Sequence, residues 1–144
     1  GTYQMDLHSI PGLGAAGGIA AGLYPFTKVE MKSGGQTIMD LIGLTKAIGQ
    51  ASLVLTGEGR IDSQSAYGKV VGTVSKACQE QDVPCIAICG SVQADFVALF
   101  DQGLLAGFPS IPSPATLDEL KISAYDNIKL TTMNVMRMVS HWLS

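Results

Sequence analysis

The sequence reads Leu-Val-Leu-Thr-Gly-Glu-Gly-Arg-Ile-Asp from Leu53 to Asp62, and this stretch decides the fold. It begins as an apolar run that ends at Leu55, which is typical of a short strand covered on both faces in a parallel sheet. Gly57 and Gly59 then predict a loop directly after the strand. Ligands of open α/β sheets bind beyond the carboxyl ends of the strands, so this loop lies where a charged ligand would arrive.

The predicted loop carries one cation and two carboxylates within five residues. Glu58 and Asp62 could hold a hydrated magnesium ion or orient a hydroxyl group, and Arg60 offers a fork for a carboxylate or a phosphate. Gly57 and Gly59 would let a ligand approach the backbone closely. A solvated surface turn is the alternative, because loops serve both purposes. The strand in front of the loop favours a site.

A second feature that favours anions follows the loop. Gly68 and Lys69 open a predicted crossover helix over 67–81, so a lysine and the free amides of a helix amino terminus lie close behind the polar loop. The segment is not a Walker loop, because Ser63 stands where its first glycine should be. An exposed lysine in a first helical turn is the alternative. We favour anion binding, with Ser65 among the contributing side chains.

A glycine-rich segment precedes an apolar run near the amino terminus. Gly12, Gly14 and Gly17 spell the G-x-G-x-x-G pattern of dinucleotide-binding folds. No convincing strand precedes it, and no acidic residue follows at the spacing that holds a ribose, so we rank a dehydrogenase module last. Close packing against a neighbouring helix is favoured over a nucleotide loop. Contact with phosphate or substrate stays open for this segment.

The rest of the chain alternates between strand and helix patterns. The expected elements are a strand over 27–32, a helix over 34–48 capped by Ser33 and interrupted at Gly43, a strand over 53–55, the helix over 67–81, a strand over 83–90 whose active edge is Gly90 and Ser91, a helix over 94–101, a strand over 104–108, and a long helix after a Thr116–Glu119 capping box. This order predicts an α/β fold with a parallel sheet and right-handed crossovers. The methionines of the last helix, Met133, Met136 and Met138, are expected in the core.

Composition limits the classes of partner. The 144 residues include nine basic and twelve acidic ones, for a net charge of −3, and no basic stripe interleaves with aromatics, which argues against nucleic acid. No run approaches the roughly 18 apolar residues of a membrane span, and no targeting signal is visible, so we expect a cytoplasmic protein. Cys78, Cys85 and Cys89 are expected to be reduced core residues. Only 15% of residues are charged, which predicts that other polypeptide covers part of the surface.

Four motifs occur in register along the chain. They are Gly-Ala-Ala-Gly-Gly-Ile-Ala-Ala-Gly-Leu from Gly14 to Leu23, Leu-Thr-Gly-Glu-Gly-Arg-Ile-Asp from Leu55 to Asp62, Gly68-Lys69, and Val-Pro-x-Ile-Ala from Val83. Together they resemble the carboxyl-terminal part of bacterial glycerate kinases over nearly the whole chain. The resemblance implies phosphorylation of D-glycerate by ATP, with magnesium, in a two-domain α/β protein.

The resemblance also implies a domain arrangement. Residues 51–144 would be the carboxyl-terminal half of a Rossmann-like domain, and residues 1–50, with the glycine-rich loop, would be the tail of a second domain inserted into the first. Family members are more than twice as long, so we expect this chain to be inactive without an amino-terminal half. The alternative is a non-catalytic α/β module that associates with itself, as a homodimer, or with a separately encoded first half.

The roles that the resemblance implies fall on the loop and the helix behind it. Asp62 or Glu58 would bind magnesium or orient the glycerate hydroxyl, and Arg60 would bind the glycerate carboxylate or the transferred phosphate. Lys69 and Ser65 would bind phosphate. The other candidate substrate or phosphate contacts are Thr56, Gly57, Gly59, Gly68, Gly14, Gly17 and Gly18.

Overall fold

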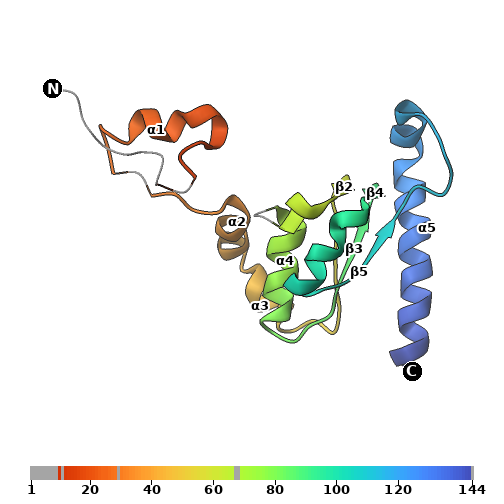
Figure 1. Ribbon diagram of the computed structural model, residues 1–144. Helices are drawn as coiled ribbons and strands as arrows, with labels where there is room; N and C mark the ends of the chain where they lie inside the picture. Colours follow the sequence, from red (N-terminus) through yellow and green to blue (C-terminus); the bar gives the residue numbers. More distant parts are fainter. Residues whose placement is uncertain (1–9, 11, 29, 67–68, 144) are drawn as a thin grey trace. The chain divides into compact units, whose positions relative to one another are not determined.

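A computed structural model describes residues 10, 12–28, 30–66 and 69–143 of the chain (Figure 1). The chain divides into two compact units, residues 1–33 and residues 34–144. The division falls within the segment 1–50 that the sequence assigned to a second domain, and that assignment stays a prediction.

The first unit depends on glycine backbone geometry. A short 3-10 helix, η2 (Ala15–Gly18), leads into α1 (Ile19–Leu23). Gly17 and Gly18 have φ angles of 69° and 80°, which side-chain-bearing residues rarely adopt. The predicted strand over 27–32 is wrong at the five described positions of that segment, with residue 29 outside them. An alternating pattern becomes a strand only beside a pairing partner, and the described residues of this unit contain no strand that could supply one.

A parallel three-stranded sheet forms the centre of the second unit, in the order β1–β3–β5. The strands are β1 (Val54–Thr56), β3 (Cys85–Cys89) and β5 (Leu104–Pro109). Val54 lies opposite Cys85 in the register of β1 and β3, and Cys85 lies opposite Leu104 in that of β3 and β5. The predicted α/β class with a parallel sheet is therefore confirmed.

The two outer strands differ from the central one in burial. All five residues of β3 are buried, whereas Leu55 in the middle of β1 is 40% exposed. The expectation that the strand before the loop is covered on both faces is thus wrong. An apolar run indicates a strand, but β1 lies at the edge of this sheet, where one face of a short strand can stay open.

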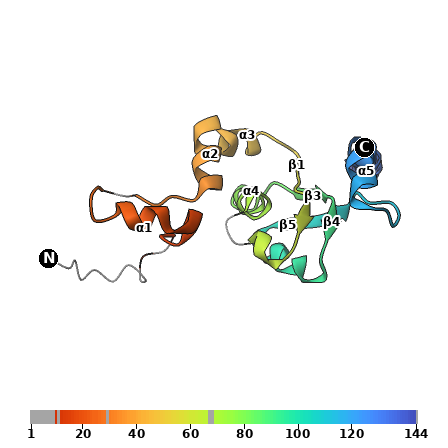
Figure 2. The same cartoon turned by 90° about the horizontal axis from the view of Figure 1, so that it is seen from above.

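The helices of the second unit follow the predicted order. In chain order they are α2 (Gly34–Ile42), α3 (Leu44–Ile48), α4 (Val70–Gln79), the 3-10 helix η4 (Ala94–Gln102) and α5 (Leu117–Leu143). A 3-10 helix that was not predicted, η3 (Ser63–Ala66), precedes α4. The interruption at Gly43 is confirmed, and its φ of 67° explains why the helix stops there. In both views the sheet lies between α4 and α5 (Figures 1 and 2).

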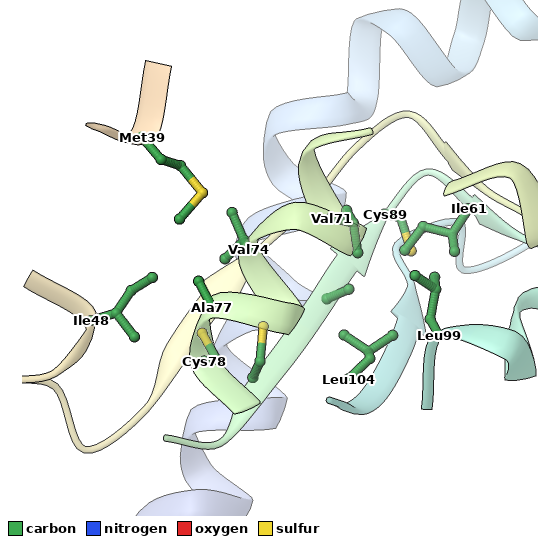
Figure 3. Packing of buried hydrophobic residues seen from close by; sticks show 12 residues of the cluster. Met39, Ile48, Ile61, Val71, Val74, Ala77, Cys78, Cys89, Leu99 and Leu104 are labelled. Carbon is green, nitrogen blue, oxygen red and sulfur yellow. The ribbon is translucent and has the colours of Figure 1, made fainter. Parts of the chain in front are cut away.

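The core forms between α4 and one face of the sheet (Figure 3). Side chains alternate between the faces of a strand, so the first, third and fifth residues of β3 point into this cluster. Its buried members are Met39, Ile48, Ile61, Val71, Val74, Ala77, Cys78, Cys85, Ala87, Cys89, Leu99 and Leu104. The three cysteines are free and buried, which confirms the prediction that they are reduced core residues.

The buried thiols make the free energy of unfolding depend on pH in the alkaline range. Burial raises the pKa of Cys78 to about 12 and that of Cys89 to about 11, from 9.0 for an exposed thiol. Above pH 9 the unfolded chain loses thiol protons that the folded chain keeps. The contribution of these thiols to the free energy of unfolding is therefore fully present below pH 9 and decreases as the pH rises towards 11. We expect urea unfolding measured from pH 7 to 10.5 to show this decline, and Cys78→Ala to make it shallower. An unchanged slope in that variant would contradict the assignment.

Helix α5 begins with the predicted capping box. The backbone N–H of Thr116 donates to Glu119 Oε2 at 2.8 Å, and the backbone N–H of Glu119 donates to Thr116 Oγ1 at 3.4 Å. Hydrogen bonds from the Thr116 hydroxyl and N–H lower the pKa of Glu119 below its usual 4.5. The prediction of a capped helix at this position is confirmed.

The burial expected for α5 is wrong. Met133, Met136 and Met138 are 50%, 40% and 48% exposed, whereas Val135 is buried. A helix of 27 residues is about 40 Å long, but a strand of six residues reaches only about 20 Å, so the sheet cannot cover the whole helix. Among the helices of the described residues, none is both long enough and apolar enough to cross a membrane.

Candidate active site

The loop after β1 is fixed by backbone pairing with the loop after β3. Two strands of two residues each, β2 (Arg60–Ile61) and β4 (Ser91–Val92), pair in parallel just beyond the sheet. Three backbone hydrogen bonds join the two loops. The N–H groups of Gly90, Ser91 and Gln93 donate to the carbonyl oxygens of Glu58, Gly59 and Ile61, at 3.2, 3.1 and 2.9 Å respectively. The sequence did not predict this pairing, because two residues are too few to show a strand pattern.

Two glycines allow the loops to lie this close. A Cβ atom at Gly57 would overlap the backbone carbonyl oxygen of Ile88, and one at Gly90 would overlap that of Gly59. Gly59 itself has open space where its Cβ would be. The Gly57 and Gly90 positions therefore need glycine for the approach of two backbones.

The charged side chains of the loop gather around Asp62. Arg60 Nε lies 3.8 Å from Asp62 Oδ2, and Lys69 Nζ lies 3.4 Å from Asp62 Oδ1. The Asp62 side chain is 21% exposed, whereas Arg60 and Lys69 are 63% and 42% exposed. The sequence predicted that these residues lie close together, and in the structure one carboxylate lies within ion-pair distance of two cations at the surface.

Ser65 connects this cluster to Glu58. Its hydroxyl donates to Glu58 Oε1, and its backbone N–H donates to Asp62 Oδ1 at 3.2 Å. The backbone N–H of Asp62 donates to Ser65 Oγ at 3.3 Å. Ser65 is fully buried, so the two carboxylates meet at a hydroxyl group that solvent does not reach.

A large cavity of about 820 Å³ opens at the carboxyl ends of β1 and β3 and is closed on one side by α5. The predicted site residues Thr56, Gly57, Glu58 and Gly59 line it. The lining from the other strand ends and from α5 is Leu55, Ile88, Cys89, Gly90, Ser91, Ser110, Ile111, Leu117, Leu120, Lys121, Ala124, Asn127, Ile128 and Thr132. The loop thus faces a hollow large enough for a small organic substrate.

Sequence reasoning missed the polar contribution of α5 to this cavity. Lys121 and Asn127 line it, together with Leu117, Ala124 and Ile128 of the same helix. These residues recur at steps of three, four and seven, which is the spacing of one helix face. That spacing could have indicated a shared face, but it could not indicate that the face borders the loop after β1.

A smaller hollow of about 400 Å³ is lined by two residues of the charged cluster, Arg60 and Asp62. Its lining is Arg60, Asp62, Ser63, Gln93, Ala94 and Asp95. A hydrogen bond from Ser63 lowers the pKa of Asp95 below 3.8, and the Arg60 guanidinium adds a smaller effect in the same direction. Gln93 and Asp95 were not predicted, because only the pairing of β2 with β4 brings them beside Arg60.

The sequence also predicted four glycines as site residues, Gly14, Gly17, Gly18 and Gly68. Gly14, Gly17 and Gly18 belong to the first unit, and Gly68 lies outside the described residues. Within the described ranges, no group of three or more histidine, cysteine, aspartate or glutamate side chains could hold a metal ion. Cys89 lines the larger cavity, but burial and the nearby Glu58 carboxylate raise its pKa, which makes its thiolate scarce near neutral pH.

An α/β protein with a charged loop beyond a parallel strand belongs to a broad class, and comparison with known proteins narrows that class. The glycerate kinase family matches residues 1–140, so the chain belongs to that family. It is 40% identical over 134 residues to glycerate 2-kinase of Escherichia coli, and 39% identical over 130 residues to glycerate kinase of Bacillus cereus. These alignments cover 93% and 90% of this chain.

A solved structure shows the same fold. A crystal structure described as a glycerate kinase 2 from Salmonella typhimurium matches 96% of this chain with a TM-score of 0.71 and 34% sequence identity. The match covers 35% of that chain, and the Escherichia coli and Bacillus cereus proteins are covered to 35% and 34%. The present chain therefore spans about a third of the length of the relatives that it matches.

Proposed function

We propose that this chain forms the carboxyl-terminal part of a glycerate kinase that transfers phosphate from ATP to D-glycerate. The observation that carries the proposal is the cluster of Glu58, Ser65 and Asp62 with Arg60 and Lys69, placed beyond a parallel strand in a member of the glycerate kinase family. Relatives that bear the activity in their names are about three times as long. We propose that the transfer needs residues outside this chain.

The reaction makes simple demands on the protein. A hydroxyl oxygen of D-glycerate forms a bond to the γ-phosphorus of ATP, the bond from that phosphorus to the bridging oxygen of the leaving ADP breaks, and the hydroxyl proton is released to solvent. Such a transfer depends mainly on positioning and on neutralising charge. In our proposal Arg60 binds the glycerate carboxylate or the transferred phosphate, and Lys69 binds phosphate. Asp62 keeps both cations oriented.

The two carboxylates suit different tasks. Both oxygens of Asp62 face cations, whereas Glu58 forms no ion pair with any described residue and lines the larger cavity. Proteins commonly bind magnesium through one or two carboxylates together with substrate phosphates, and Glu58 fits that mode better than Asp62. We propose that Glu58 holds hydrated magnesium or orients the glycerate hydroxyl. Bound magnesium would neutralise phosphate charge.

The second candidate function is association without catalysis. It is favoured by the apolar side chains that α5 exposes, of which Ile122, Tyr125 and Leu117 are 86%, 75% and 69% exposed. Leu55 on the edge strand β1 is another exposed apolar side chain, at 40%. Apolar groups in such number commonly mark a protein interface. In this case the chain would bind a second copy or a separately encoded partner.

A chimera separates the two functions. The segment of the Escherichia coli relative that aligns with this chain is replaced by this chain, and ADP release is measured with ATP, D-glycerate and magnesium. We expect turnover by the chimera, none by the 144-residue chain alone, and recovery when the chain is mixed with the remainder of the relative. A folded chimera without turnover would favour the association function, and omission of D-glycerate serves as the control.

A further inference from the structure

The hydroxyl group of Ser65 already has hydrogen-bond partners within the protein. A serine hydroxyl carries a single proton, and here it is donated to Glu58 Oε1. The oxygen of the same hydroxyl accepts the backbone N–H of Asp62 at 3.3 Å. The side chain is fully buried, so a bound phosphate could not reach it without breaking both contacts.

Ser65 lies between two carboxylates that line different hollows. Glu58 lines the cavity of about 820 Å³, and Asp62 lines the hollow of about 400 Å³. Ser65 bonds to both carboxylates, to one through its hydroxyl and to the other through its backbone N–H at 3.2 Å. It therefore fixes the distance and direction between a carboxylate in one hollow and a carboxylate in the next.

We propose that Ser65 is a positioning residue that holds the Glu58 carboxylate in register with Asp62 and does not contact phosphate. This role replaces the phosphate-binding role that the sequence predicted for Ser65. Its effect on catalysis rests on the proposed kinase function, whereas its effect on the orientation of Glu58 does not.

Alanine at this position tests the hydroxyl group. Ser65→Ala removes the hydroxyl that donates to Glu58 and accepts the backbone N–H of Asp62, but it keeps the Ser65 backbone N–H that donates to the Asp62 carboxylate. In the chimera we expect turnover to fall by roughly 10- to 100-fold, the range for loss of a residue that orients a functional group. The KM values for ATP and D-glycerate should stay within about twofold, because uniform binding is retained.

Three variants guard against a general packing effect. Ser75→Ala is the matched control, because Ser75 is also fully buried and its Oγ lies 3.7 Å from the Cys85 Sγ. It should leave turnover unchanged. Ser65→Thr keeps the hydroxyl and should restore most of the turnover. Ser65→Cys should lower turnover as Ser65→Ala does, because a thiol is a weak hydrogen-bond donor. If Ser65→Ala does not fold, Ser65→Cys serves as the test variant in its place.

A second readout does not depend on activity. NMR of the 144-residue chain reports whether the Glu58 side chain keeps one rotamer. We expect rotamer averaging of Glu58 in Ser65→Ala, an unchanged side-chain rotamer of Asp62, and no averaging of Glu58 in Ser75→Ala. A fixed Glu58 in Ser65→Ala, or a raised KM for ATP with unchanged turnover, would overturn the proposal. If the unsubstituted chimera is inactive, the kinase function fails, and the NMR result still decides the positioning role.

Discussion

Replacing Gly57 by alanine is expected to lower the free energy of unfolding by about 2–3 kcal/mol, the effect of forcing an extra group into a packed site. The added Cβ atom would overlap the backbone carbonyl oxygen of Ile88. A backbone atom in a central strand cannot move aside as a flexible side chain can, so β1 and β3 would have to separate where the loop begins.

Gly59→Ala is the matched control for this change. It lies two residues further along the same loop, and apart from its chain neighbours no described residue has a heavy atom within 4 Å of its Cβ position. We expect urea unfolding to show a change below about 1 kcal/mol for Gly59→Ala, as for most substitutions without a steric conflict. Equal stability of the two variants would contradict the close packing of Gly57 against β3.

Replacing Asp62 by asparagine is expected to lower turnover of the chimera by roughly 10²- to 10³-fold, the range for loss of a preorganised electrostatic group. Asparagine keeps an oxygen for the Ser65 N–H but loses the charge that orients Arg60 and Lys69. Both cations would then take other directions at the surface. The loss should appear in turnover even when both substrates are saturating.

Glu30→Gln is the charge-matched control for Asp62→Asn. Glu30 Oε1 lies 3.2 Å from Lys32 Nζ, and both side chains are well exposed. The substitution removes one carboxylate charge from an ion pair outside the cluster, and exposed pairs contribute little. A similar fall in turnover for both variants would show that net charge, and not the orientation of the two cations, controls the reaction.

Local patterns predicted the elements of the second unit well. The apolar run before Cys89, the helical spacing in α4 and the Thr116–Glu119 capping box each rest on neighbours within a few residues. Such patterns are visible in a single sequence, because they repeat the geometry of one element. The order of those elements then indicated a parallel sheet.

Features that depend on distant contacts were missed. The exposure of Leu55 and of the α5 methionines depends on which other elements pack against β1 and α5. Periodicity in the sequence indicates which residues share a face, but it does not indicate whether another element packs against that face. The strand expected over 27–32 fails for the same reason.

In the candidate site too, residues that are close in sequence were predicted, whereas contacts that depend on how the loops fold were missed. The sequence identified Glu58, Arg60 and Asp62, because they follow a strand within a few residues of one another. It could not identify the Ser65 bonds to two carboxylates, which require the loop to fold back on itself. Gln93 and Asp95 come from another loop and needed the pairing of β2 with β4.

The pairing of β2 with β4 also limits how this site can change by mutation. Backbone bonds join the two loops at three further points, so an inserted or deleted residue in one loop would shift its register against the other. Loops around active sites usually tolerate changes in length, and these two should not. If the proposed kinase function holds, new substrate preference at these loops is expected to arise by exchange of side chains at constant loop length.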